Sequence, residues 1–167
     1  LDDLEKNNLQ IKERELDKIS VCKEYLLTAQ DGKNYKTKLY SFDAHHFVSG
    51  LIKSAEKSII LIDNYIDESV LILLSKRKPE TEAIIFTDAI SKQLRLDIAR
   101  FNAQYPKIEV KIFKKSHDRF LIIDHQTVYH LGASLKDLGK KWFAFSKIDL
   151  EPGEMIEKLT PATTGNH

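Results

Sequence analysis

The chain has 167 residues, of which 42% are hydrophobic and 31% charged, a composition typical of one soluble globular domain. Its formal net charge is only +1, so any nucleic-acid binding has to use a local basic patch. The single cysteine, Cys22, excludes an internal disulfide framework and favours the reducing cytoplasm, and the absence of any run of about 18 apolar residues predicts no membrane span.

Residues 1–30 contain no Gly or Pro and are rich in Leu, Glu and Lys, which predicts a long N-terminal helix. Two roles for this helix remain open, a linker and a short dimeric coiled coil. The coiled coil is indicated by apolar residues at heptad-like spacing, namely Leu9, Leu16, Ile19 and Leu26. Because the chain starts with helical character and without an initiator methionine, we expect it to be a fragment of a longer protein.

Residues 31–159 are expected to form the main domain, followed by a polar tail over residues 160–167. Apolar runs and apolar–polar alternation predict strands over residues 35–39, 58–62, 82–87, 108–113, 120–123, 127–131 and 142–148. Helical stripes and caps predict helices over residues 47–55, 66–74, 91–101 and 151–159. This order predicts an α/β fold, with a mixed, largely parallel sheet and helices on both faces. Strands 35–39 and 108–113 are expected at or near its edges, because charged residues interrupt them.

The segment over residues 117–134 is the most informative part of the chain. Four large apolar residues separate Arg119 from Asp124, which is typical of a strand covered on both faces. His117 and Arg119 lie at its beginning, with side chains on one side because strand side chains repeat every two residues. A second run ends in a small-residue turn at Ser134. The pattern predicts a hairpin-like pair that carries a His, an Arg and a hydroxyl to one edge, where a phosphate can bind.

This segment resembles the motif of the phospholipase D superfamily, His-x-Lys followed by four residues and Asp, then a Gly/Ser turn. The resemblance implies that His117 is the nucleophile that becomes a phosphohistidine, and that Arg119 stands in the place of the phosphate-binding Lys. It also implies that Asp124 and the turn at Ser134 support the phosphate, with Lys136 nearby. Arg binds phosphate with a planar fork that keeps its proton, so this replacement changes the chemistry of the site.

A narrower resemblance rests on residues 130–141, which contain the sequence Gly-Ala-Ser-Leu-Lys-Asp-Leu-Gly-Lys-Lys. They are similar to the phospholipase D-like C-terminal domain of phage-type DNA-binding proteins of bacteria. This similarity implies that the domain accompanies a DNA-binding region elsewhere in the protein.

Asn64 and Tyr65 follow the predicted strand over residues 58–62, and ligands of α/β sheets bind beyond the carboxyl ends of strands. Both are therefore candidate phosphate-binding residues. The neighbouring Asp63 and Asp67 are candidates for helix capping. No metal site and no cofactor is expected, because His45 and His46 are adjacent on a helix and the chain has no spaced His/Cys cluster.

The chain carries one His motif, whereas phospholipase D chemistry uses two histidines, one as nucleophile and one as general acid. We therefore expect a homodimer in which two copies of His117 face one phosphate, with His125 and His130 as weaker in-chain rivals. Lysines that could follow a nucleic-acid backbone surround the motif, namely Lys111, Lys114, Lys115, Lys136, Lys140 and Lys141.

Three functions remain open from the sequence. The first is a metal-independent phosphodiesterase of the nuclease type that acts on nucleic acid. The second is a catalytically inactive module that dimerises and assists DNA binding by the rest of a larger protein. The third is a purely structural interaction domain. The retained His117, Asp124 and Ser134 favour the first, and the Lys-to-Arg replacement at Arg119 favours the second.

Overall fold

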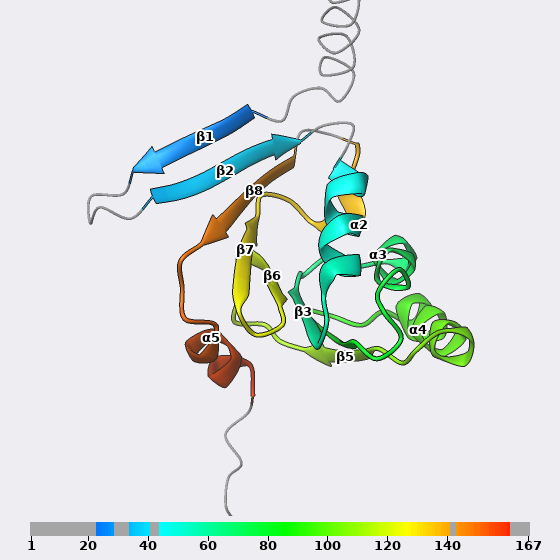
Figure 1. Cartoon of the computed structure of the whole chain (residues 1–167). Helices are drawn as coiled ribbons and strands as arrows, with labels where there is room; N and C mark the ends of the chain where they lie inside the picture. Colours follow the sequence, from blue (N-terminus) through cyan, green and yellow to red (C-terminus); the bar gives the residue numbers. More distant parts are fainter. Residues whose placement is uncertain (1–22, 29–33, 41–43, 141–142, 161–167) are drawn as a thin grey trace, which may run out of the picture.

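The computed structural model describes residues 23–28, 34–40, 44–140 and 143–160 (Figure 1). The strands are β1 (Lys23–Thr28), β2 (Asn34–Tyr40), β3 (Ser58–Ile62), β4 (Glu82–Thr87), β5 (Glu109–Ile112), β6 (Arg119–Ile123), β7 (Thr127–Leu131) and β8 (Phe143–Ile148). The helices are α2 (Ala44–Ser54), α3 (Glu68–Leu74), α4 (Lys92–Gln104) and α5 (Pro152–Leu159), with a 3-10 turn, η1 (Leu135–Asp137).

The described strands form one mixed sheet in the order β1-β2-β8-β7-β6-β3-β4-β5. The predicted mixed α/β fold is confirmed, but the parallel share is smaller than expected. Only the β3–β4 and β4–β5 pairings are parallel, and the other pairings are antiparallel. The reason is the length of the connections. Helices separate β3, β4 and β5, whereas the short β6–β7 loop and the connection through η1 permit only antiparallel neighbours.

Helices cover both faces of the sheet, as predicted (Figure 1). Helices α2, α3 and α4 pack on one face, and α5 packs on the other through Leu159, Met155 and Ile156. Strand β3 lies between the two layers: its alternate side chains Ile59 and Leu61 join the larger core, and the remaining two isoleucines join the smaller one. Each such side chain contributes about 1.5–3 kcal/mol on burial, which explains why this strand is continuously apolar.

The prediction of one helix over residues 1–30 is wrong at its C-terminal end. Residues Lys23–Thr28 form β1, which pairs antiparallel with β2 from Lys23↔Leu39 to Thr28↔Asn34. Helix propensity is a weak preference, and a six-residue ladder with a neighbouring strand overrides it. Residues 1–22, with most of the heptad-like positions, lie outside the described residues, so the linker and coiled-coil roles stay predictions.

The edges of the sheet differ in part from the prediction. Strand β5 lies at one edge, as expected, but β2 lies between β1 and β8, so that β1 is the other edge. Most of the predicted polar tail over residues 160–167 lies outside the described residues. None of the described helices has the length and apolar character that crossing a membrane requires.

Local signals in the sequence set the helix starts and the tight hairpin. The side chain of Asp67 accepts a hydrogen bond from the Ser69 N–H and begins α3, and Ser91 begins α4 by accepting from the Leu94 N–H. Between β6 and β7 the residues Asp124 and His125 have φ values of 54° and 55°. Both positive values match a type I′ turn, whose twist fits the flanking strands.

Two glycines give opposite predictions for stability. Gly50 lies exposed within α2, and a Cβ there would meet nothing within 4 Å. We therefore expect Gly50→Ala to raise the free energy of unfolding by about 0.5–1 kcal/mol, because Gly loses more backbone entropy in a helix than Ala does.

Gly139 has φ +79°, and a Cβ there would lie 3.1 Å from Cδ2 of His45. Urea unfolding of both variants should show Gly139→Ala destabilised; equal behaviour of the two variants would contradict this assignment.

Candidate functional site

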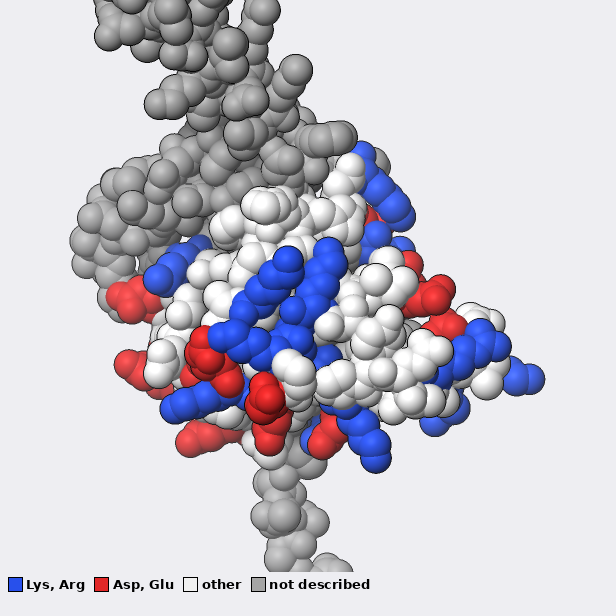
Figure 2. Space-filling view, turned by 45° about the vertical axis from the view of Figure 1, so that its right-hand side comes forward, with Lys and Arg blue, Asp and Glu red and all other residues white. Residues whose placement is uncertain are grey.

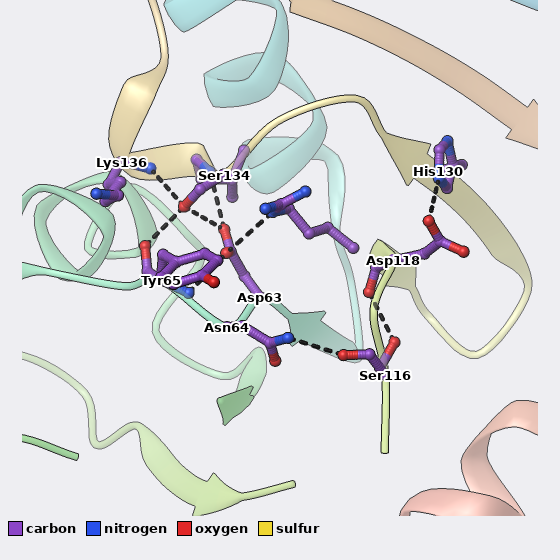
Figure 3. A network of polar contacts seen from close by, with 10 residues as sticks. Asp63, Asn64, Tyr65, Ser116, Asp118, His130, Ser134 and Lys136 are labelled. Atoms are coloured by element: carbon purple, nitrogen blue, oxygen red, sulfur yellow. Dashed lines mark hydrogen bonds and ion pairs between the residues drawn. The ribbon is translucent and has the colours of Figure 1, made fainter. Parts of the chain in front are cut away.

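A buried carboxylate at the end of β3 organises the candidate site (Figure 3). Asp63 follows the apolar strand directly, and its side chain is fully buried. Its Oδ1 accepts the Tyr65 N–H at 3.1 Å, and its Oδ2 accepts the Leu135 N–H at 2.8 Å and the Ser134 hydroxyl at 2.9 Å. Asp63 therefore ties the end of β3 to the turn that follows β7, 71 residues later in the chain.

Burial raises the pKa of the Asp63 carboxyl above its ordinary value. The hydrogen bonds from Leu135, Tyr65 and Ser134 and the positive charge of Arg119 act in the opposite direction, but they compensate only in part. The Ser134 hydroxyl also contacts the Tyr65 carbonyl oxygen, at 2.6 Å. Ser134 is therefore occupied in holding the two segments together.

Arg119, the first residue of β6, forms an ion pair with the carboxylate of Asp63. Its Nε lies 3.7 Å from Oδ1 of Asp63, which is an ion pair but too long for a hydrogen bond. The Nε atom is buried and has no hydrogen-bond partner among the described residues. The guanidinium carbon lies 5.7 Å from the centre of the Tyr65 ring. Arg119 thus shares its charge with a carboxylate and a ring, and its side chain is only 24% exposed.

Tyr65 stands at the solvent-facing side of the cluster, with 58% of its surface exposed. Its ring has a second cation beside it, because Nζ of Lys136 lies 5.9 Å from the ring centre. Two positive side chains beside an exposed aromatic ring are suited to a ligand that carries both a phosphate and a flat base. Lys136 is positioned by η1, to which it belongs. At the start of η1, the Ser134 side chain accepts a hydrogen bond from the Lys136 N–H, and Asp63 accepts one from the Leu135 N–H.

Asn64 connects this cluster to the loop that carries His117. Its Nδ2 donates to the Ser116 carbonyl oxygen at 2.7 Å, and the Ser116 hydroxyl donates to the Asp118 carbonyl oxygen at 2.7 Å. The Oδ1 atom of Asn64 is buried without a partner in the described part of the chain. His117 itself is exposed, and no hydrogen bond or ion pair joins it to another described residue. Its loop is anchored on both sides, while its imidazole faces solvent.

Asp124 lies apart from these residues, at the opposite end of β6. The length of this strand separates it from Arg119 by roughly 16 Å. Its carboxylate accepts the backbone N–H groups of Glu56, Lys57 and Ser58 at 2.6–3.0 Å. It therefore joins the β6–β7 turn to the start of β3, and the structure does not bring it near His117.

His130 also lies away from the Asp63 cluster. It pairs with Phe120 across β6 and β7, and their rings contact edge-on at 5.5 Å. Its Nε2 lies 3.5 Å from Oδ1 of Asp118. Because side chains alternate along a strand, Phe120 and His130 face the layer of α5, whereas Arg119 faces the opposite layer. The in-chain rival for a second catalytic histidine is therefore separated from Arg119 by the sheet.

The structure brings together five of the predicted site residues, namely Asn64, Tyr65, Arg119, Ser134 and Lys136. Asp63 was predicted only as a helix cap, whereas the cap is Asp67. One signal in the sequence could have identified Asp63: an acidic residue that directly follows a fully buried strand has to find hydrogen-bond donors in the interior. Asp63 finds them in a turn that is distant in the sequence.

The lysines around the motif are mostly exposed. Lys111 pairs with Glu109 at 3.0 Å and Lys140 with Asp137 at 3.8 Å, while Lys141 lies outside the described residues. Over the described ranges, no three His, Cys, Asp or Glu side chains converge in a way that could hold a metal ion.

Comparisons with known proteins establish the fold. The chain is similar to the solved structure of NucT from Helicobacter pylori, with a TM-score of 0.53 and 16% sequence identity over 75% of this chain and 92% of NucT. It is also similar to TrmBL2, an archaeal chromatin protein with a novel mode of DNA binding, with a TM-score of 0.48, 16% identity and coverage of 92% of this chain and 60% of TrmBL2. No protein-family model and no curated protein sequence matches the chain. At this level of identity the similarity concerns the fold alone, and the chain shares the fold of NucT.

The carboxylates of Asp63 and Asp124 give a prediction with opposite pH dependences. Partial burial raises the pKa of Asp124, but the hydrogen bonds from Glu56, Lys57 and Ser58 outweigh this effect and lower it overall. Its ionised form therefore contributes stability that is present above the unfolded pKa of about 3.9 and is lost as the pH falls through the lower folded pKa. We expect Asp124→Asn to cost about 1–2 kcal/mol at neutral pH, and less as the pH falls, in urea unfolding.

The Asp63→Asn variant tests the opposite pH dependence of the stability. Because the pKa of Asp63 is raised, its ionisation costs stability as the pH rises from the unfolded value towards the folded one. Wild type should therefore lose stability relative to Asp63→Asn over that range. A difference between wild type and either variant that does not change with pH would contradict the assigned pKa shift.

Proposed function

We propose that this chain is a phospholipase D-like domain that binds nucleic-acid phosphodiesters at the Asp63 cluster and cleaves them through His117 without a metal. The observation that carries the proposal is the placement of Arg119 and Lys136 beside the exposed Tyr65 ring, with the His117 loop tied to the same strand end. The two cations supply charge for a phosphate, and the ring offers a stacking surface for a base.

The reaction follows from the resemblance of the motif to that of the superfamily. A neutral imidazole of His117 attacks phosphorus, and the bond from phosphorus to the leaving oxygen breaks. The leaving oxygen takes a proton from His117 of the partner subunit, acting as general acid. Water then attacks the phosphohistidine and returns its proton to that second imidazole. The free, solvent-facing imidazole of His117 is suited to this role, since no described side chain occupies it.

The proposal includes a homodimer, because the domain has one His motif and the chemistry requires two imidazoles. His130 does not serve as the second one, since Phe120 and His130 pack on the other face of the sheet from Arg119. A two-fold axis near the exposed His117 loop would bring the two copies to one phosphate. Cytoplasmic location is part of the same proposal and rests on the single cysteine.

One observation favours the alternative function, a catalytically inactive dimerisation and DNA-binding-accessory module. Arg119 already has a carboxylate partner in Asp63, which offsets the positive charge that a phosphorane transition state needs. A guanidinium held by Asp63 and Tyr65 can bind a phosphate, but its position is then too rigid to adjust to the geometry of the transition state.

The decisive experiment uses the purified chain with single- and double-stranded DNA in EDTA. We expect metal-independent cleavage that falls by about 100-fold or more in His117→Ala, because the nucleophile is lost. A Lys147→Gln variant, exposed and distant from the cluster, serves as the matched control. Cleavage that persists in His117→Ala contradicts the proposed role of His117. DNA binding without cleavage by wild type supports the inactive module. In that case, a gain of cleavage in Arg119→Lys would identify the planar guanidinium of Arg119 as the cause of the missing activity.

The dimer is tested separately by light scattering. We expect a mass about twice the 19.3 kDa of one chain, because a single-motif site is complete only with two copies. The mass is to be measured over a range of protein concentrations, in the presence and absence of a short oligonucleotide. A mass of one chain under all these conditions would contradict the shared-site proposal.

A further inference from the structure

Basic side chains also gather at a second place, away from the Asp63 cluster. Four exposed lysines, Lys53, Lys57, Lys76 and Lys78, lie where α2 and α3 end and β3 begins; we refer to them as the α2–α3 basic patch. Figure 2, in which the side of the molecule with α2, α3 and α4 comes forward, shows lysine and arginine side chains concentrated near the middle of the face. Residues 53–57 and 76–80 together hold five basic and two acidic residues, in a chain with a net charge of +1.

Side-chain contacts hold the patch together. The Nζ of Lys76 lies 3.0 Å from the Ser49 hydroxyl on α2, and Lys53 follows Ser49 by one helical turn on the same face. Lys78 forms an ion pair with Glu56, the residue before Lys57. The four lysines thus belong to one continuous surface, although α2 and α3 contribute them from separate segments.

Arg77 fixes the loop on which Lys76 and Lys78 lie. Its side chain is buried and donates to the carbonyl oxygens of Leu74, Thr81, Pro106 and Lys107 at 2.6–3.1 Å. A buried guanidinium with this many acceptors is strongly held. In the sequence Lys-Arg-Lys the central residue therefore anchors the loop from inside, and the two lysines beside it are held outward.

The surface beside the lysines is unusually open. Gly50 lies three residues before Lys53, exposed, with no atom near enough to explain the absence of a side chain by packing. Of the two neighbouring serines, Ser54 is exposed and Ser49 is buried, and α2 contains no acidic residue. A flat helix surface with lysines at its margin lets a phosphate backbone approach the helix closely.

We propose that the α2–α3 basic patch binds the phosphate backbone of nucleic acid and is a second contact surface, separate from the Asp63 cluster. The inference rests on the proposed function for its ligand class. The patch lies at the start of β3 and the Asp63 cluster at its end, which places them on the order of 15 Å apart, or about four to five phosphate steps of one strand. One nucleic acid can therefore contact both.

Nucleic acid fits this surface better than an anionic membrane does. Membrane-surface binding requires apolar side chains that insert beside the basic ones. Of the large exposed hydrophobic side chains in the described part of the chain, only Ile72 lies on α2 or α3. The patch thus offers charge and hydrogen bonds with almost no apolar area, which suits a polyphosphate backbone.

The test compares two triple variants of the full 167-residue chain by fluorescence anisotropy with a labelled DNA duplex, in EDTA and over a series of salt concentrations. The patch variant is Lys53→Gln with Lys76→Gln and Lys78→Gln. The control removes the same charge elsewhere, with Arg95→Gln, Lys147→Gln and Lys158→Gln, all exposed positions. We expect the slope of log affinity against log salt to fall by about 2–3 in the patch variant, because each lysine neutralises about one phosphate. We expect little change in the control.

The outcomes separate this inference from the proposed function. An unchanged slope in the patch variant, or an equal loss in both triple variants, overturns the inference. If Lys136→Gln weakens binding while the patch variant does not, only the inference fails and the proposed site stands. If wild type binds vesicles containing phosphatidylserine rather than DNA, and the patch variant loses that binding, the ligand class is wrong and the inference is overturned.

A second pair of variants tests the open helix surface. Gly50→Glu places a negative charge beside the lysines, and Gly50→Gln introduces a side chain of nearly the same size without charge. We expect both to weaken DNA binding, the Glu variant by about tenfold more than the Gln variant at low salt, with circular dichroism unchanged. Equal, wild-type affinity in both variants would overturn the role of this face.

Discussion

The buried carboxylate of Asp63 is the interaction on which the candidate site depends. It accepts the Tyr65 and Leu135 N–H groups and the Ser134 hydroxyl, and it lies beside the guanidinium of Arg119. These groups come from the end of β3, the start of β6 and the turn after β7, so one side chain holds three segments in register. Burying this carboxylate without these donors would cost free energy. The hydrogen bonds of Asp63 and its burial therefore have to form together.

The sheet explains why these segments meet. Strand β3 is the boundary between the parallel half of the sheet and its antiparallel half, since it pairs parallel with β4 and antiparallel with β6. The end of β3 and the beginning of β6 therefore lie at the same edge. Asp124, at the end of β6, is brought by the same geometry to the start of β3, where three backbone N–H groups bind its carboxylate. The two acids thus stabilise opposite ends of one strand.

The electrostatics of the domain are local rather than global. With a net charge of +1, the chain has no overall attraction for nucleic acid. Arg119 and Lys136 nevertheless lie beside Tyr65 at one end of β3, and four lysines lie near the ends of α2 and α3 at the other. At physiological salt, charges interact over roughly 8 Å, so each group acts as a separate contact. Such an arrangement favours binding along an extended polyanion over capture of a single small anion.

The sequence by itself determined the order of strands and helices from residue 34 onward, because apolar periodicity and caps such as Asp67 and Ser91 are local signals. It also indicated Asn64, Tyr65, Arg119, Ser134 and Lys136 as candidates, since motif spacing and strand ends are visible in a linear chain. Tertiary structure alone decided that residues 23–28 form a strand and that most strand pairings are antiparallel. It also decided that Asp63 joins the cluster while Asp124 lies a strand length away. Those outcomes depend on which strands lie side by side, and that choice is made by hydrogen-bond pairing and burial between residues as many as 72 positions apart.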